Sequence, residues 1–259
     1  MLKNDIIIKN IFVFVFIIIS MKKFFIRAFK VKKWAVNLSI VLTLAVVAIS
    51  CFAFYPYTQA MSVSGVYYTG NKESNNVSLM INVYWGSEYI DDMLSCLKEK
   101  GVKATFFVGG TWAVMNEDCL KKIYDDGHEI ANHGYHHKDH DKLDEKGNIN
   151  EIQTTHKIIQ ELLGIEMNLF APPSGAYDKL TVSCASSLGY KTIMWTRDTI
   201  DWRDHDQNLI YNRAIKNASG GDLILMHPTK ETSLALPSII DYFLSKNLNV
   251  TTVGENIGI

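Results

Sequence analysis

The sequence predicts a parallel α/β fold, either closed as a barrel or wound as an open sheet. Seven short apolar runs, rich in β-branched and aromatic residues, are typical of strands, and segments with a helical period lie between them. Strands that alternate with helices favour a parallel sheet with right-handed crossovers. The strand candidates are residues 77–83, 103–109, 129–133, 168–172, 190–196, 222–227 and 248–253.

The chain before the first of these strands divides into a basic segment, an apolar segment and a polar linker. Residues 1–33 carry a cluster of Lys and Arg just before the apolar stretch 34–54. That stretch has about the length of the roughly 20 apolar residues that a membrane-spanning helix needs. Cations on its N-terminal side orient such a helix with residues 1–33 in the cytoplasm. We therefore expect a cell-membrane protein whose main domain is extracytoplasmic, joined to the anchor by a linker at 55–76 with one short strand in VSGVYYT as an option.

Two alternatives remain open for the N-terminal region. Residues 34–54 also fit a signal sequence, either uncleaved or cut near Ala60, although the usual signal core has only roughly 7 to 15 apolar residues. MKKFF at Met21 looks like an ordinary start of an exported protein, which would make residues 1–20 an extension of the reading frame. Each alternative still places the main domain outside the cytoplasm.

Apolar stripes and glycines mark the helices of the main domain. Apolar residues within 90–97 and within 236–244 each fall on one helical face. A glycine just past a helix end favours a left-handed cap. Three glycines are placed to close helices in this way, namely Gly127, Gly164 and Gly189.

Charge and cysteine spacing argue against a nucleic-acid-binding protein and against a domain held together by cysteines. The 259 residues carry 26 basic and 27 acidic side chains, and residues 60–259 show no basic stripe of the kind that binds nucleic acid. Cys96, Cys119 and Cys184 are widely spaced and odd in number, which fits neither a metal knuckle nor a complete disulfide framework. We expect these three cysteines to be small core hydrophobes.

Chemically distinctive side chains follow several of the predicted strands. In barrels and in open parallel sheets, ligands bind at the C-terminal ends of the strands. Taken singly, each of these residues could belong to a polar surface, a turn or the buried core. Their shared placement at strand ends indicates one site. They are Tyr84 to Gly86, Gly109 and Gly110, His133 to His137, Pro172 and Pro173, Thr196 to Trp202, and His227.

The order of these motifs resembles the NodB-type polysaccharide deacetylases, carbohydrate esterase family four, over residues 77–257. KATFFVGG at 103–110 is similar to the second-strand signature of that family, and GHEIANHGYHH at 127–137 to its H-(S/T)-x-x-H metal motif. FAPPSG resembles R-P-P-Y-G, DTIDW resembles D-x-x-D-W, and LMH resembles L-x-H. The resemblance implies a distorted (β/α)7 barrel over residues 77–259. A weaker similarity points to the membrane-anchored, sporulation-associated members of the family.

The family resemblance implies a metal-dependent amide hydrolase that acts on N-acetylated glycan. In the family, one Asp and two His hold a divalent metal such as zinc, a second Asp is the base, and the His of L-x-H is the acid. The two metal ligands correspond to His133 and His137. His227 corresponds to the acid, and Asp198 belongs to the same catalytic set.

Both Asp positions of the family differ in this chain. The motif T-F-D-D-G aligns with NVYWG at 82–86, so Tyr84 takes the position of the base and Trp85 that of the metal ligand. An indole nitrogen can only donate, and a phenol is protonated near neutral pH. Catalytic zinc normally has three protein ligands, so a divalent metal would be held weakly. Ala171 stands where the family has the Arg that orients its base.

The sequence is compatible with three functions. The first is a deacetylase of cell-wall or spore-envelope glycan whose third metal ligand is replaced. The second is a catalytically impaired relative that binds glycan without turnover, and the third is a structural envelope protein. The expected partners are glycan and membrane, but not nucleic acid. Candidates for a replacement ligand are Glu88, His136, Asp139, His140 and Asp141, and the expected substrate contacts are Tyr84, Trp85, Pro173, Trp202 and Leu225.

Overall fold

The computed structural model describes Val41, Thr43 and residues 65–259. The second of the two compact units of the chain, Val63–Ile259, contains the fold discussed below. The predicted segments 1–33 and 34–54 lie outside the described residues, apart from Val41 and Thr43. Within the described residues, no helix has the length and apolar character needed to cross a membrane.

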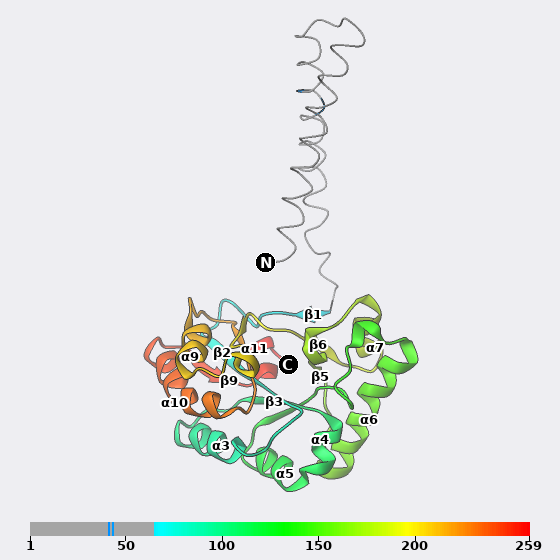
Figure 1. The fold of residues 1–259 in the computed structure, drawn as a ribbon, viewed down its shortest axis with the longest axis horizontal. Coiled ribbons are helices and arrows are strands. Elements are labelled where there is room, and N and C mark those ends of the chain that lie inside the picture. The colour runs from blue at the N-terminus through cyan, green and yellow to red at the C-terminus, as the bar shows by residue number, and fades with distance from the viewer. Residues whose placement is uncertain (1–40, 42, 44–64) are drawn as a thin grey trace, which may run out of the picture. The chain divides into compact units, whose positions relative to one another are not determined.

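A parallel sheet forms the centre of the domain (Figure 1), as the sequence predicts. Its strands follow the order β1-β6-β5-β4-β3-β2-β8-β7, and β9 pairs with β2 beside this path. β1 and β7 stand at opposite ends of the path, so the sheet is a half-barrel rather than a complete barrel. The strands are β1 (Val66–Tyr67), β2 (Asn76–Val83), β3 (Thr105–Val108), β4 (Glu129–Asn132), β5 (Leu169–Phe170), β6 (Lys191–Ile193), β7 (Arg197–Asp198), β8 (Leu223–Met226) and β9 (Asn249–Thr251).

The central strand is β2, the longest of the sheet. All of its residues after Asn76 are buried, as expected for a parallel strand covered on both faces. It pairs in parallel with β3, β8 and β9. This position brings the residues that follow β2 to the middle of one edge of the sheet.

All seven predicted strands are present, and every one except β2 is shorter than predicted. Two further strands, β1 and β7, contain two residues each. β1 lies within the predicted linker 55–76, at the short strand considered there, and pairs with β6. β7 pairs with β8. Two residues are too few to show the alternation that marks a strand in a sequence.

Helices flank the sheet (Figure 1), with α10 packed on α9 and α3, and α6 packed on α4 and α7. Two short 3-10 helices, η1 (His140–Lys142) and η2 (Pro173–Gly175), lie in the loops. The α-helices are α3 (Ile90–Glu99), α4 (Gly110–Met115), α5 (Glu117–Asp125), α6 (Glu145–Leu163), α7 (Lys179–Ser187), α8 (Asp201–Asp204), α9 (Gln207–Ile215), α10 (Lys230–Ser245) and α11 (Val253–Ile257).

Local signals explain where several helices begin and end. The Asp144 carboxylate accepts a hydrogen bond from Gly147 N–H and caps α6, and Asp178 forms a capping box with Thr181 at the start of α7. Gly164 ends α6 at φ 70°, as predicted. Gly127 and Gly189 also adopt positive φ, 77° and 82°, after α5 and α7.

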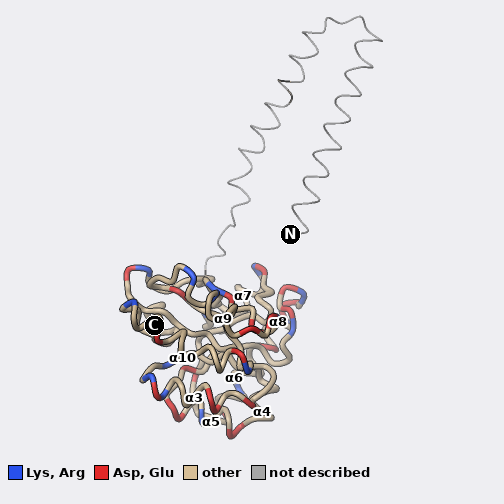
Figure 2. Tube along the Cα trace, turned by 60° about the vertical axis from the view of Figure 1, so that its left-hand side comes forward, with Lys and Arg blue, Asp and Glu red and all other residues tan. Residues whose placement is uncertain are grey.

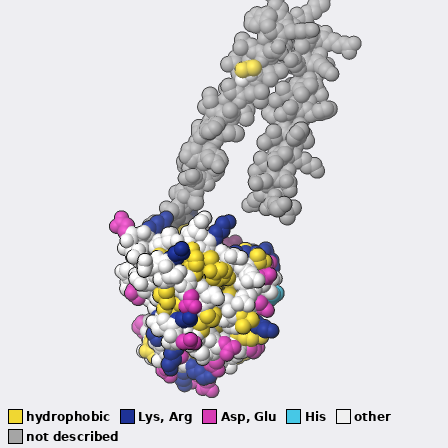
Figure 3. Space-filling model, turned by 90° about the vertical axis from the view of Figure 1, so that its left-hand side faces the viewer, with side chains coloured by type: hydrophobic (Ala, Val, Ile, Leu, Met, Phe, Trp, Pro, Cys, Tyr) yellow, Lys and Arg dark blue, Asp and Glu magenta, His cyan; other side chains and the backbone are white. Residues whose placement is uncertain are grey.

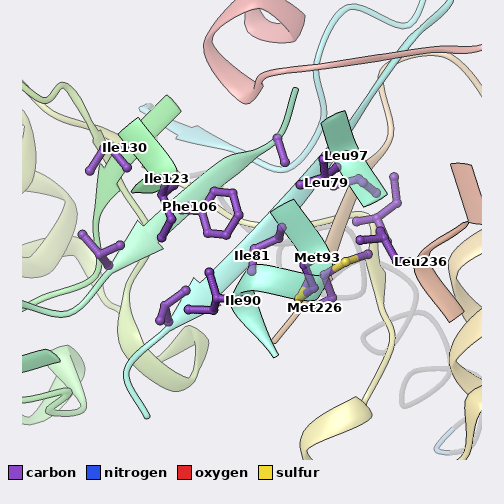
Figure 4. Packing of buried hydrophobic residues seen from close by; sticks show 14 of the residues in the cluster. Leu79, Ile81, Ile90, Met93, Leu97, Phe106, Ile123, Ile130, Met226 and Leu236 are labelled. Atoms are coloured by element: carbon purple, nitrogen blue, oxygen red, sulfur yellow. The ribbon is translucent and has the colours of Figure 1, made fainter. Parts of the chain in front are cut away.

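Most buried apolar side chains form one cluster on one face of the sheet (Figure 4). Leu79 and Ile81 of β2 lie there with Ile90, Met93 and Leu97, which form the predicted stripe on α3. The alternating residues Met80 of β2 and Phe107 of β3 belong to a second, smaller cluster. Side chains of a strand point alternately to its two faces, so the two clusters cover opposite faces of the sheet.

The three described cysteines are free, and two of them, Cys96 and Cys184, are buried. Burial raises the pKa of Cys96 and of Cys119 to about 11. Cys96 lies in the main core cluster and Cys119 packs against it, so these two side chains act as core hydrophobes, as predicted.

The described surface of the domain mixes charges of both signs. Figure 2 shows Asp and Glu interspersed with Lys and Arg along the chain. Three leucines remain exposed: Leu209 of α9, and Leu234 and Leu244 of α10. On one face, Figure 3 shows such apolar side chains surrounded by both kinds of charge.

Candidate functional site

Four neighbouring strands end level with one another, which explains why predicted site residues meet. The last residues of these strands are register partners: Val83, Val108, Asn132 and Phe170. The residues that follow them therefore share one edge of the sheet: Tyr84, Gly109, His133 and Ala171. Backbone hydrogen bonds continue along this row, for example from His133 N–H to the Val108 carbonyl at 3.0 Å.

His133 has the orientation of a metal-binding histidine. Its Nδ1 lies 2.8 Å from the Ala171 carbonyl oxygen, which can only accept, so Nδ1 carries the proton and Nε2 keeps its lone pair. Metal-binding histidines are commonly held by such a hydrogen bond. Burial lowers the pKa of His133 well below its usual range, and the nearby imidazole of His137 lowers it further. The ring is therefore neutral near pH 7.

His137 lies against both of the substituted aromatic residues. Its ring stacks on Tyr84 at a centroid distance of 4.5 Å and an interplanar angle of 28°. It also lies edge-on to His133, with centroids 5.0 Å apart. The Tyr84 hydroxyl donates to the His136 carbonyl at 3.3 Å. Tyr84 thus packs on the loop that carries His137, whose pKa is lowered by burial.

Trp85 contacts two histidines of the site, His227 and His137. Its ring stacks on His227 with centroids 5.2 Å apart and an interplanar angle of 21°. It meets His137 edge-on at 6.5 Å. The Trp85 residue is 45% exposed, so it is open to solvent while it covers His227.

His227 is held by the buried carboxylate of Asp201, which lies in a stretch that the sequence places at the site but which received no predicted role of its own. The Asp201 Oδ1 lies 2.7 Å from His227 Nδ1, and Asp201 Oδ2 accepts from His227 N–H at 2.6 Å. The Thr232 hydroxyl donates to the same Oδ2 at 2.6 Å. Since Asp201 is fully buried, this network fixes the His227 ring. The D-x-x-D-W pattern was the signal for Asp201.

Asp198, the other carboxylate of that motif, lines the cavity described below. Its Oδ1 accepts from Ile200 N–H at 2.8 Å, which shapes the turn into α8. Burial raises the pKa of Asp198, while that hydrogen bond and the nearby His227 lower it. Asp198 therefore contributes to the site wall, and Asp201 is the carboxylate bonded to His227.

A cavity of about 370 Å³ opens at this edge of the sheet. Its lining includes Asn82, which is only 4% exposed. The Asn82 Oδ1 is buried and has no hydrogen-bond partner among the described residues. The lining residues are Asn82, Trp85, His133, His137, Ser174, Gly175, Trp195, Asp198, Trp202, Leu225 and His227.

The cavity brings together most of the predicted site residues. Three predicted substrate contacts, Trp85, Trp202 and Leu225, line it together with His133, His137, Asp198 and His227. Tyr84 lines a neighbouring hollow instead, and Pro173 is buried in η2. The sequence did not indicate Asn82, Ser174 or Trp195, because they become neighbours only in the folded chain. The roles of the predicted residues stay predictions.

The residues of this site do not fit a catalytic divalent metal. His133 offers a lone pair, but Trp85, at the expected third-ligand position, carries only an N–H donor. The described part of the chain contains no cluster of three or more His, Cys, Asp or Glu side chains that could hold a metal ion.

The candidate replacement ligands have other partners. His140 Nδ1 bonds to Asn148 at 2.6 Å, Asp139 pairs with Lys142, and Glu88 accepts from Ser87 N–H. Together with His136 and Asp141, they form no ligand cluster with His133 and His137 among the described residues.

The fold and site define a class: a parallel α/β half-barrel with a histidine-lined cavity at its strand ends. The sequence model described as polysaccharide deacetylase matches residues 69–193. A solved structure of a carbohydrate esterase family 4 pseudoenzyme from Bacillus anthracis is 34% identical, covers 74% of this chain and 68% of its own, and superimposes with a TM-score of 0.72. This chain belongs to the polysaccharide deacetylase family, carbohydrate esterase family 4.

Other relatives extend the comparison. A mutant of that pseudoenzyme with restored enzymatic activity is 33% identical, covers 74% of this chain and 71% of its own, and has a TM-score of 0.72. The uncharacterized protein YlxY of Bacillus subtilis is 40% identical over 73% of this chain and 59% of its own length. The peptidoglycan-N-acetylglucosamine deacetylase PgdA of Listeria monocytogenes is 27% identical over 72% and 40%. The chain thus spans about 59% and 40% of these two curated relatives.

Proposed function

We propose that this polysaccharide deacetylase-like protein binds N-acetylated cell-wall glycan without hydrolysing it. One observation carries the proposal: Trp85 stacks on His227 at the position where the family has a metal-binding carboxylate. Loss of a general base typically costs a factor of about 10² to 10⁴ in rate, and loss of a metal removes several kcal/mol of charge stabilisation. Both losses fall on neighbouring residues, Tyr84 and Trp85.

The cavity retains what glycan binding needs. Ligand sites are mostly apolar, with a few well-placed polar groups that fix orientation. Trp85, Trp195 and Trp202 supply aromatic surface around the cavity, and sugar rings have apolar faces that stack on such surfaces. Ser174 and Asp198 line the same cavity, and their side-chain oxygens can accept from a hydroxyl or amide N–H of the sugar.

The relatives support a choice of glycan class. The Listeria protein PgdA is a deacetylase of peptidoglycan N-acetylglucosamine, so peptidoglycan strands are the proposed ligand here. An anchor at residues 34–54 would hold the domain beside this polymer, on the extracytoplasmic side of the cell membrane. The similarity to the sporulation-associated members of the family extends the proposal to the spore envelope.

Residual hydrolysis is the second candidate function. It is supported by the Asp201–His227 pair at 2.7 Å, because a histidine oriented in this way can protonate a departing amine. The step also needs a water made nucleophilic by a base. Tyr84 replaces that base, so we rank hydrolysis below binding.

Calorimetric titration with chitooligosaccharides, paired with an assay for released acetate, tests the proposal. The full-length chain is titrated once with a metal chelator and once with added zinc. We expect equal affinity in both conditions and no acetate, because no described ligand cluster couples the site to a metal. Zinc-dependent acetate release would favour the second candidate, and absence of glycan binding would refute the proposal.

A further inference from the structure

A second hollow adjoins the cavity, and Trp85 belongs to both. The hollow has a volume of about 400 Å³ and lies between the loop after β2 and helix α4. Its walls include Tyr84, Trp85, Glu88, Thr111, Trp112 and Met115. Because Trp85 lines both, the cavity and the hollow are neighbouring compartments that meet at this residue.

The walls of the second hollow are fixed by hydrogen bonds within the protein. The Trp112 indole N–H donates to the Gly86 carbonyl at 2.8 Å, which ties α4 to the loop after β2. The Asn116 side-chain amide donates to the Trp112 carbonyl at 3.0 Å. The hollow is therefore formed before any ligand arrives, which reduces the entropy cost of binding.

The chemistry of these walls combines apolar surface with oxygen atoms. Met115 is 74% exposed and Trp85 is 45% exposed, so a thioether and an indole face solvent at the same trough. Methionine adapts to irregular apolar surfaces. Thr111 and Glu88 bring a hydroxyl and a carboxylate to the same hollow. A sugar has apolar ring faces and hydroxyl edges, and it matches both kinds of group.

We propose that one glycan chain crosses Trp85, with one sugar in the cavity and the next sugars in the second hollow against Met115. The inference rests on the proposed glycan-binding function and adds that the protein recognises a chain longer than a disaccharide. We assign the second hollow to a sugar of the same chain, because Trp85 lines both compartments and so connects them.

Binding of chitooligosaccharides of two to six sugars to the full-length chain tests the inference. We expect the affinity to rise at least about tenfold from the disaccharide to the tetrasaccharide. Met115→Ala should weaken tetrasaccharide binding about three- to tenfold and leave disaccharide binding unchanged, because only the longer ligand reaches the hollow. Val114→Ala is the matched control: this residue is 55% exposed on the same helix but does not line the hollow.

The outcomes separate the two proposals. Equal affinity for all lengths, or a Met115→Ala variant with unchanged tetrasaccharide binding, would overturn the inference while glycan binding itself stands. Equal losses in Met115→Ala and Val114→Ala would also overturn it, since they would reflect the helix and not the hollow. Absence of binding at every length would overturn both. Thermal unfolding of each variant checks that these exposed substitutions leave the fold intact.

Discussion

At the scale of the residue, Tyr84 and Trp85 together occupy the two positions at which the family motif has Asp. Each ring lies on an imidazole: Tyr84 on His137 and Trp85 on His227. Ala171 is consistent with both changes, because an arginine there would lack the carboxylate it orients, and an unpaired desolvated cation is costly. The alignment of NVYWG predicted these substitutions, but only the folded chain shows that the new rings cover the remaining histidines.

Replacing Trp85 by alanine should weaken glycan binding strongly. Tryptophans central to an interface typically contribute about 2 kcal/mol or more, or roughly a thirtyfold change in affinity. Stability should change little, because the residue is 45% exposed. Calorimetric titration measures the affinity. Tyr124→Ala serves as control, since Tyr124 is an exposed aromatic of α5 outside the described cavity. Unchanged affinity in Trp85→Ala would contradict the assigned role.

His128 should make the domain acid-sensitive. Burial, with help from Lys103, lowers the pKa of His128 from 6.5 to about 4. The unfolded chain therefore binds the proton more readily, so stability is complete above about pH 6.5 and falls as the pH drops toward 4. The loss amounts to at most about 3 kcal/mol. Urea unfolding at several pH values should show a shallower decline for His128→Gln, and parallel curves would exclude this contribution.

At the scale of the element, the strand ends of the sheet explain which parts of the site could be predicted. Continuous apolar runs revealed β2, β3, β4 and β8, and the residues after them followed directly. β1 was only an option in the sequence and β7 was not found, because each pairs over only two residues. Pro173, a predicted substrate contact, is buried in η2, and its role stays a prediction. Ser174 and Trp195 depend on how two loops meet, which a single sequence does not show.

Tyr84, which follows β2, and Gly109, which follows β3, should be coupled in their effect on the free energy of unfolding. A Cβ added to Gly109 would lie 2.7 Å from Tyr84 Cδ2, although the Gly109 φ of −76° suits any residue. Gly109→Ala should therefore destabilise the domain by about 1–3 kcal/mol through overpacking. In a Tyr84→Ala background the cost should largely disappear, which a double-mutant cycle by chemical denaturation measures. Equal costs in both backgrounds would refute the coupling.

At the scale of the whole molecule, the chain has the fold of the polysaccharide deacetylase family, and the family resemblance aligns Tyr84 and Trp85 with the positions of the base and of one metal ligand. Fold and function can separate within a family because activity depends on a few site residues placed on a scaffold. The half-barrel carries the cavity and the Asp201–His227 pair, and we propose that it lacks the base and the third metal ligand of the family. The restored activity of the mutant Bacillus anthracis relative shows that a pseudoenzyme of this family can be returned to catalysis.

The most direct test of this account is acetate release from chitooligosaccharide with zinc present, measured in parallel for the natural chain and for the variant Tyr84→Asp/Trp85→Asp/Ala171→Arg. We predict acetate at the background level for the natural chain and clear release by the variant, which regains a base, its orienting arginine and a third ligand beside His133 and His137. Adding His133→Ala to the variant should abolish that release. Zinc-dependent acetate release by the natural chain would contradict the account.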